Sequence, residues 1–219
     1  ALQAQGRAAI APRGVTAELD VNGAIDGLAP GVTGRVASVV SLTPETFTLD
    51  AQLMDARAGE LRLRAATVRA TGPMSAIAMT YALRGRVREA PLVFEGTGVA
   101  DLEGDAHIRL DGRGTLAASD VFTRAPIDLQ FGDRAMTASL NVALGDGVLM
   151  AQWQDRGRAL SGSAQVENAP LEPLAAIWGE HADGHIDGRL TLVNNGRGLS
   201  GDADLTLIDA RLAGRQRGR

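Results

Sequence analysis

Apolar residues recur at every second position along much of this 219-residue chain. The clearest instance is Met136-Thr-Ala-Ser-Leu-Asn-Val-Ala-Leu144, where apolar and polar side chains alternate throughout. A period of two places successive side chains on opposite faces of an extended strand, so one face is apolar and the other is wet. Repetition of this pattern predicts many half-buried strands and favours them over a helical bundle.

Turn signals separate these segments, as in a meander of antiparallel neighbours. Gly145-Asp-Gly147 precedes a predicted strand at Val148–Trp153, and Gly132-Asp133 ends one at Ile127–Phe131. A slip in the alternation at Ala65-Ala66 indicates a β-bulge. Other predicted strands cover residues 15–21, 35–42, 47–53, 61–64, 77–83, 92–94 and 107–110. A turn-rich passage is expected through Asn22-Gly23, Asp26-Gly27 and Pro30-Gly31.

The residue content fits an all-β chain. Apolar residues make up 45% of the sequence, enough for a sizeable core, while aromatics are only 3% and glycine contributes 27 residues. Strands joined by Gly-centred turns account for that balance better than helices do. No linker or composition shift divides the chain, so we expect one continuous β-segment over residues 1–219, with a boundary at Ser119–Ala125 as the alternative.

An apolar-polar-Gly triplet repeats along the chain, often at the roughly 8–13-residue spacing of strands in an all-β sheet. Its glycines stand at positions 23, 27, 96, 104, 112, 162, 188 and 201. In one interpretation each glycine lies inside a long strand and lets the sheet curl around a groove. In the other, the triplets are ordinary hairpin turns.

One short helix is expected in the C-terminal part of the chain. Apolar residues at helical spacing run from Leu171 to Trp178, Pro173 fits the first turn, and Gly179 ends the segment. A helix of about two turns is not stable alone, so it must pack against the strands.

The sequence shows no convincing pattern of residues for catalysis or metal binding. The chain has no cysteine, which excludes disulfides and thiolate sites. The strongest metal candidate is His181-Ala-Asp-Gly-His185-Ile-Asp187, but a zinc pair at this spacing needs a helix, and Asp183-Gly184 predicts a turn. His107 is expected to be alone on the surface of a strand. We therefore expect no enzymatic activity, no metal and no cofactor.

The chain carries a formal net charge of −4, and its acids are interleaved with 22 basic residues, all of them arginine. An extended basic patch is not visible in this pattern, so we expect no nucleic-acid partner. No apolar run approaches the roughly 18–20 residues of a membrane-spanning helix. The chain opens without a signal peptide and ends in an Arg-Gly stretch, so we expect an internal segment of a longer protein.

On the residues alone, the repeated apolar face favours a closed sandwich or barrel, in which that face is the core. A structural module of a secreted β-solenoid or adhesin-like protein is a second interpretation, although the strict period and the Asn or Thr ladders of solenoids are missing. An outer-membrane barrel is a third, and it needs aromatic girdles that a 3% aromatic content does not supply.

Residues 164–212 form the clearest repeat unit of the chain. The short helix precedes two alternating segments, His185–Val193 and Leu199–Ile208, separated by a turn signal at Asn194–Gly198. This order resembles the repeat of the TamB family of AsmA-like proteins over about the last quarter of the chain, and the remainder shares only its texture of short strands. The matching residues are Pro170, Leu171, Leu174, Gly184, Gly188, Leu190, Leu192, Leu199, Ser200, Gly201, Leu205 and Leu207.

TamB-family proteins bridge the inner and outer membranes of Gram-negative bacteria. The resemblance implies an elongated, curved, mostly antiparallel sheet that forms an open, taco-shaped apolar groove with one short helix. It also implies that the groove carries phospholipid acyl chains through the periplasm and supports outer-membrane assembly. An inner-membrane anchor and the contact with an outer-membrane assembly barrel are implied to lie outside this segment. The residues implied to line the groove are Leu61, Leu63, Ile77, Met79, Leu83, Leu129, Phe131, Met136, Leu140, Val142, Leu144, Leu190, Leu192, Leu205 and Leu207.

Overall fold

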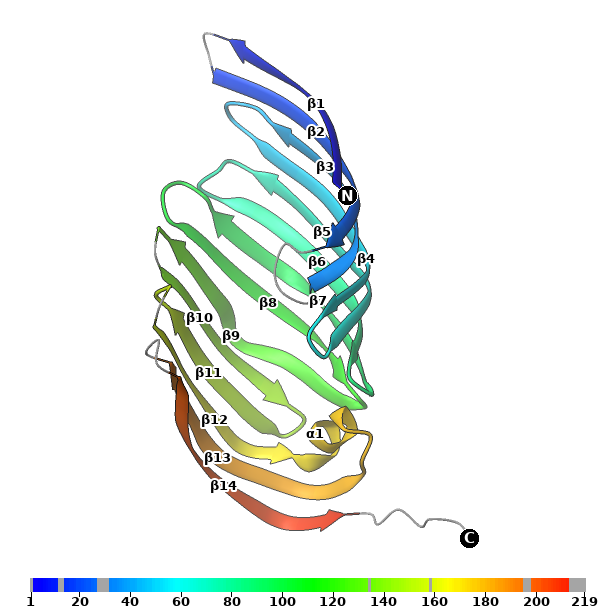
Figure 1. The fold of residues 1–219 in the computed structure, drawn as a ribbon, viewed down its shortest axis with the longest axis vertical. Helices are drawn as coiled ribbons and strands as arrows, with labels where there is room; N and C mark the ends of the chain where they lie inside the picture. Colours follow the sequence, from blue (N-terminus) through cyan, green and yellow to red (C-terminus); the bar gives the residue numbers. More distant parts are fainter. Residues whose placement is uncertain are drawn as a thin grey trace.

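The computed structural model describes residues 2–11, 14–26, 32–133, 135–157, 159–194 and 198–212. These residues form one sheet of fourteen strands and one short helix (Figure 1). Each strand is antiparallel to the strands before and after it, and the order of strands in the sheet equals their order in the chain. The prediction of an all-β chain with a mostly antiparallel sheet is confirmed.

The strands are 9–14 residues long. In chain order the elements are β1 (Leu2–Ala11), β2 (Gly14–Asp26), β3 (Val32–Leu42), β4 (Phe47–Ala58), β5 (Leu61–Gly72), β6 (Ile77–Val87), β7 (Ala90–Asp101), β8 (Ala106–Leu116), β9 (Ser119–Gly132), β10 (Ala135–Leu144), β11 (Gly147–Asp155), β12 (Leu160–Pro170), α1 (Leu171–Ile177), β13 (Ala182–Asn194) and β14 (Leu199–Leu212).

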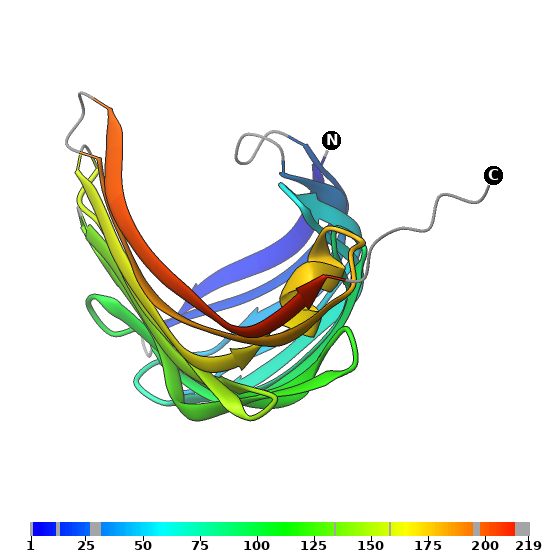
Figure 2. The same cartoon turned by 90° about the horizontal axis from the view of Figure 1, so that it is seen from below.

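The sheet is open. β1 and β14 each pair with a single neighbour and form its two edges. Figure 2 shows the strands bent into a trough whose open side no further strand covers. The closed sandwich or barrel that the residues alone favour is therefore wrong for the described part of the chain. Closure into a barrel would require β1 to pair with β14, and these two strands are not paired.

Few side chains of the described residues are buried. The buried hydrophobic residues number nine, and all but Ile77 and Leu144 are alanines. Ile77 packs with Ala70 and Ala100 near the loops that follow β5 and β7, where the Leu102 amide donates to the Met74 carbonyl at 2.7 Å. A core this small cannot determine the fold alone. The backbone hydrogen bonds between neighbouring strands therefore hold most of the sheet together.

Most predicted strands are present and extend further than expected. Asn22-Gly23, expected in a turn, lies inside β2, because this part of β2 pairs with both β1 and β3 and that pairing overrides the local turn preference. The bulge predicted at Ala65-Ala66 is confirmed by a register shift between Leu63 and Ala65. β9 runs without interruption through Ser119–Ala125, the alternative domain boundary.

The glycine triplets are mostly strand features. Gly23, Gly96, Gly112, Gly162, Gly188 and Gly201 lie inside strands. Gly104 lies in the turn between β7 and β8, and Gly27 lies outside the described residues. Among the described residues, six of these glycines therefore lie within strands and one lies in a turn. That the strand glycines let the sheet curl around a groove stays a prediction.

The predicted helix is confirmed as α1, with Trp178 as its C-cap and Gly179 at φ +72° directly after it. α1 packs on β13 and also reaches β7, far away in the sheet. There the Glu89 amide donates to the Ile177 carbonyl at 3.4 Å, and the Arg88 guanidinium lies 5.6 Å from the Trp178 ring centre. α1 thus braces one margin of the trough. In the expected turn at Asn194–Gly198, residues 195–197 lie outside the described residues, and β13 and β14 pair as predicted.

Candidate functional site

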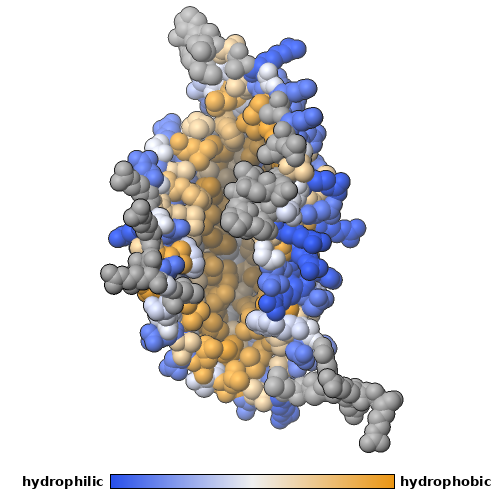
Figure 3. All heavy atoms as spheres, viewed as in Figure 1, coloured by the Kyte–Doolittle hydropathy of each residue, from blue (hydrophilic) through white to orange (hydrophobic). Residues whose placement is uncertain are grey.

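The strand register gathers apolar side chains on one face of the sheet, named here the apolar face. Leu140 of β10 lies opposite Ala151 of β11, which lies opposite Ala164 of β12, which lies opposite Leu190 of β13. Directly opposed residues share a face, so this row crosses four strands without a polar side chain. Figure 3 looks onto the hollowed side of the sheet and shows hydrophobic residues along its length, with hydrophilic residues at its margins.

All fifteen residues predicted to line a groove fall on the apolar face by register. Ile77 and Leu144 are only 1% and 5% exposed, so their side chains face other parts of the protein. The other thirteen are half-buried or exposed, with Leu207 reaching 59%. That these side chains touch lipid remains a prediction.

The apolar face also holds residues that sequence reasoning missed. Leu53 and Val68 continue it on β4 and β5, and Trp153 on β11. The bulge between Leu63 and Ala65 hides Val68, because it breaks the period-two pattern of β5. Leu53 ends the alternating segment 47–53, so its place on the strand was visible in the sequence. Phe94 and Ile186 are apolar members of the glycine triplets, whose first and third residues share a face within a strand. The triplet itself was thus the signal for those positions.

Large side chains on the apolar face lie over glycines of neighbouring strands. A Cβ at Gly112 of β8 would stand 2.6 Å from Phe94 Cε1 and 2.6 Å from Tyr81 Oη, closer than real Cβ atoms come. A Cβ at Gly188 would likewise stand 2.6 Å from Leu205 Cδ2. Because glycine has no side chain, these bulky groups can lie flat against the sheet, and the surface of the apolar face is smoother there.

Tyr81 brings a polar group to the middle of the apolar face. Its Oη donates to the backbone carbonyl of Asp111 at 3.1 Å, and its ring stacks on Phe94 with centroids 6.2 Å apart. Burial raises the pKa of the Tyr81 phenol above its ordinary value, and the negative charge of Asp111 raises it further. The hydroxyl therefore stays neutral and already has its acceptor.

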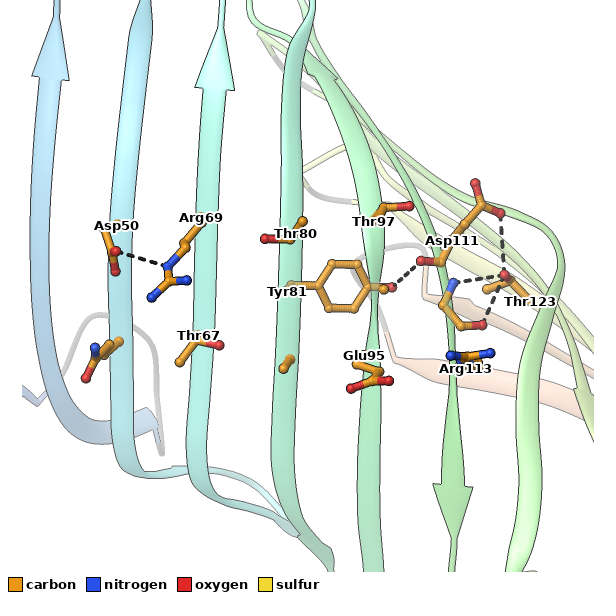
Figure 4. Close-up of a pocket in the computed structure, with 14 residues that line it drawn as sticks. Asp50, Thr67, Arg69, Thr80, Tyr81, Glu95, Thr97, Asp111, Arg113 and Thr123 are labelled. Atoms are coloured by element: carbon orange, nitrogen blue, oxygen red, sulfur yellow. Dashed lines mark hydrogen bonds and ion pairs between the residues drawn. The ribbon is translucent and has the colours of Figure 1, made fainter.

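The opposite side of the sheet, named the polar face, carries an open depression of about 770 Å³ across β4 to β9 (Figure 4). Its charged lining residues are Asp50, Arg69, Glu95, Asp111 and Arg113. Arg69 Nε donates to Asp50 Oδ2 at 3.1 Å, and both side chains are more than half exposed. Three acids and two arginines are mixed across the depression, so its charge favours no single class of ligand.

Two histidines lie in settings that differ from expectation. His107, expected alone, has its Nε2 2.7 Å from Asp128 Oδ2 on the neighbouring strand. His185 lies in β13 and not beside a turn, because a bulge at Gly184 keeps the strand extended, and its Nε2 is 3.4 Å from Asp146 Oδ2. Among the residues that the structure describes, no group of three or more His, Asp or Glu is placed to hold a metal ion.

Within the described ranges, α1 and any other helical segment fall short of the length and apolarity needed to span a membrane. Comparisons with protein-family models, curated proteins and solved structures found no match.

Proposed function

We propose that the apolar face forms a groove that holds lipid acyl chains, and that the chain is one segment of a bridge along which phospholipids move between two membranes. The observation that carries the proposal is the apolar face itself, which runs from β2 to β14 with no second layer over it in the described part of the chain. A contiguous apolar surface of that extent marks a binding surface. The resemblance to the TamB family supports the same function.

The chemistry of the face favours a hydrocarbon occupant. Away from the strand ends, the polar side chains described on the apolar face are those of Ser38, Tyr81 and Thr123. Tyr81 Oη is bonded to a carbonyl, and Thr123 Oγ1 accepts the Gly112 amide at 3.0 Å. A protein or sugar occupant would leave its own polar groups unpaired on such a face, which is costly, whereas an acyl chain has none to pair.

The dimensions suit movement along the sheet. Neighbouring strands lie about 4.8 Å apart, so fourteen strands span on the order of 60 Å from edge to edge. One leaflet contributes about 15 Å to the roughly 30 Å hydrocarbon core of a bilayer, so an acyl chain covers only part of that length. Most of the lining is leucine, valine, alanine and glycine, and its larger members, such as Tyr81, Phe94 and Trp153, are also largely apolar. A chain can therefore advance without meeting a deep trap.

The free energies make such shielding worthwhile. Each buried methylene contributes about 0.8 kcal/mol, so a phospholipid with about 30 methylenes would lose on the order of 20 kcal/mol in crossing water unshielded. A groove that covers the tails removes most of that cost at every step. Transport of this kind needs no catalytic residue.

Photo-crosslinking in the full-length protein tests the proposal. Leu140 and its neighbour Ser139 lie side by side in β10 on opposite faces, so a photoreactive amino acid at 139 is the matched control for one at 140. We expect lipid to be captured at 140 and not at 139. Capture of a second copy of the chain at 140, or equal lipid capture at both positions, would contradict the proposal.

A further inference from the structure

Arginine side chains gather on the polar face where β4, β5 and β6 end at one margin. Arg57, Arg62 and Arg86 are directly opposed on these three adjacent strands, and Arg64 and Arg84 lie one step further along β5 and β6. Figure 3 shows hydrophilic residues massed along this margin, on its right-hand side. Strand register brings these arginines together, which is why the sequence shows no basic patch.

The five arginines line an open pocket of about 530 Å³ that contains a single acid, Asp55. Asp55 is already paired with Arg35. Arg86 has a distant partner in Glu89, 3.9 Å away. The other four arginines have no ion pair with any residue in the described ranges. A protein with a net charge of −4 thus concentrates unpaired positive charge at one margin.

This arrangement opposes the stability of the sheet. Like charges directly opposed across an antiparallel pair are destabilising, and here three stand in one row. A bound anion removes that repulsion. Guanidinium groups present their donors in a planar fork that matches the oxygens of a phosphate and binds them two at a time.

We propose that this arginine pocket binds the phosphate of an anionic lipid headgroup. β5 carries Leu61 and Leu63 on the apolar face and Arg62 and Arg64 on the polar face at the same margin. A lipid whose tails lie along the apolar face therefore places its headgroup within reach of long arginine side chains. The pocket walls add Pro91 and the exposed Val93 and contain no aromatic ring, so they lack the stacking surface that single-stranded nucleic acid uses.

This inference rests on the proposed function for the position of the lipid tails. Its test measures anion binding by the pocket independently of lipid capture on the apolar face. Three forms of the protein are compared by flotation with vesicles: wild type, R62Q/R86Q, and the control R124Q/R189Q, which removes two exposed arginines elsewhere on the sheet. One set of vesicles contains phosphatidylglycerol in phosphatidylcholine, and the other contains phosphatidylcholine alone.

Wild type and control are expected to prefer the anionic vesicles, and R62Q/R86Q is expected to lose roughly tenfold or more in affinity for them. Its melting temperature should equal or exceed that of the wild type, because the repulsion is relieved. A structural role for the arginines would lower it instead.

Equal vesicle binding by R62Q/R86Q and the control would overturn the inference. So would binding of pyrophosphate without a preference for anionic vesicles, which assigns the pocket to a free anion, or displacement of the vesicles by a single-stranded oligonucleotide. Lipid capture at position 140 is measured in parallel. If capture at 140 fails while the arginine-dependent preference persists, only the proposed function fails; the reverse result removes only the headgroup site.

Discussion

Tyr81 is the single tyrosine of the chain and lies across two strands, over glycines that leave room for its ring. Its hydroxyl has an acceptor in the Asp111 carbonyl, and its ring has a partner in Phe94. Such a residue joins strands through side-chain contacts in a sheet that has few of them. Titration of its phenol therefore probes the environment of the apolar face.

The pKa of Tyr81 gives the first prediction. Burial and the charge of Asp111 raise it above the value of about 10 that an unfolded chain shows. Between the unfolded and folded pKa values, the folded state binds more protons than the unfolded state. The contribution of Tyr81 to the free energy of unfolding is therefore fully present below about pH 10 and is lost as the pH rises through the folded pKa. Absorbance of the phenolate, read during alkaline titration of the folded protein, measures it, and Tyr81→Phe removes the signal. A midpoint at or below that of the denatured chain would contradict the assignment.

Leu140 and Ile77 lie on the same face but differ in exposure: Leu140 is partly open to solvent, whereas Ile77 is closed off by other residues. Leu140 is half-buried, so Leu140→Arg can direct its guanidinium to water, and we expect it to lower the free energy of unfolding by less than about 2 kcal/mol. Ile77 is 1% exposed, so Ile77→Arg buries a charge and should cost more than about 4 kcal/mol. Denaturant unfolding measures both.

Transport by the full-length protein completes this comparison. Leu140→Arg should abolish lipid transport although the protein remains folded, because the charge would stand in the proposed path of the acyl chains. An unfolded Leu140→Arg variant would mean that the apolar face is ordinary core.

At the scale of elements, α1 links two distant parts of the sheet, β13 and β7. Its seven residues cannot hold a helix alone, so packing on β13 and contact with the β6–β7 turn must stabilise it. Trp178→Ala removes the interaction with Arg88 and should lower the free energy of unfolding by about 0.5–1 kcal/mol.

Hydrogen exchange locates the effect of Trp178→Ala. The Glu89 amide, which donates to Ile177, should exchange faster in the variant, together with the amides of α1. Trp153→Ala, a change on the sheet itself, is the control and should leave these amides unchanged. Unaltered exchange at Glu89 in Trp178→Ala would show that α1 is held by other contacts.

Local sequence signals predicted the elements well where pattern and pairing agree. The alternation from Met136 to Leu144 became β10, and the apolar spacing from Leu171 with Gly179 after it became α1. They failed at Asn22-Gly23, where pairing on both sides outweighs a turn preference. They also failed at Gly184, where a bulge absorbs the glycine within β13.

At the scale of the molecule, neither the openness of the sheet nor its arginine pocket could be predicted from a single sequence, and the reasons differ. An apolar strand face has the same pattern in a closed core and in an open trough, so the residues alone favoured the wrong one. The pocket depends on which strands pair in which register, as the row of Arg57, Arg62 and Arg86 illustrates. Alternation groups apolar residues within each strand, and strand register then brings the fifteen residues implied by the resemblance to one face.

Lipid should stabilise the whole molecule by occupying the apolar face. A short-chain phospholipid, kept below its micelle concentration at 100 times its dissociation constant, is expected to raise the free energy of unfolding by about 2.7 kcal/mol. Glycerophosphocholine, which has the headgroup without tails, is the control and should have no effect. Thermal unfolding measures both, and equal stabilisation by the two compounds would rule out binding through the tails.

Because strand order follows chain order without a crossover, the length of the sheet is independent of its cross-section. Each strand depends on its two neighbours, so an added or deleted hairpin changes the span by about 10 Å and leaves the remaining ladders intact. A fold with a central core would have to repack to grow. In this fold, the number of hairpins alone sets the length of the sheet from its first strand to its last.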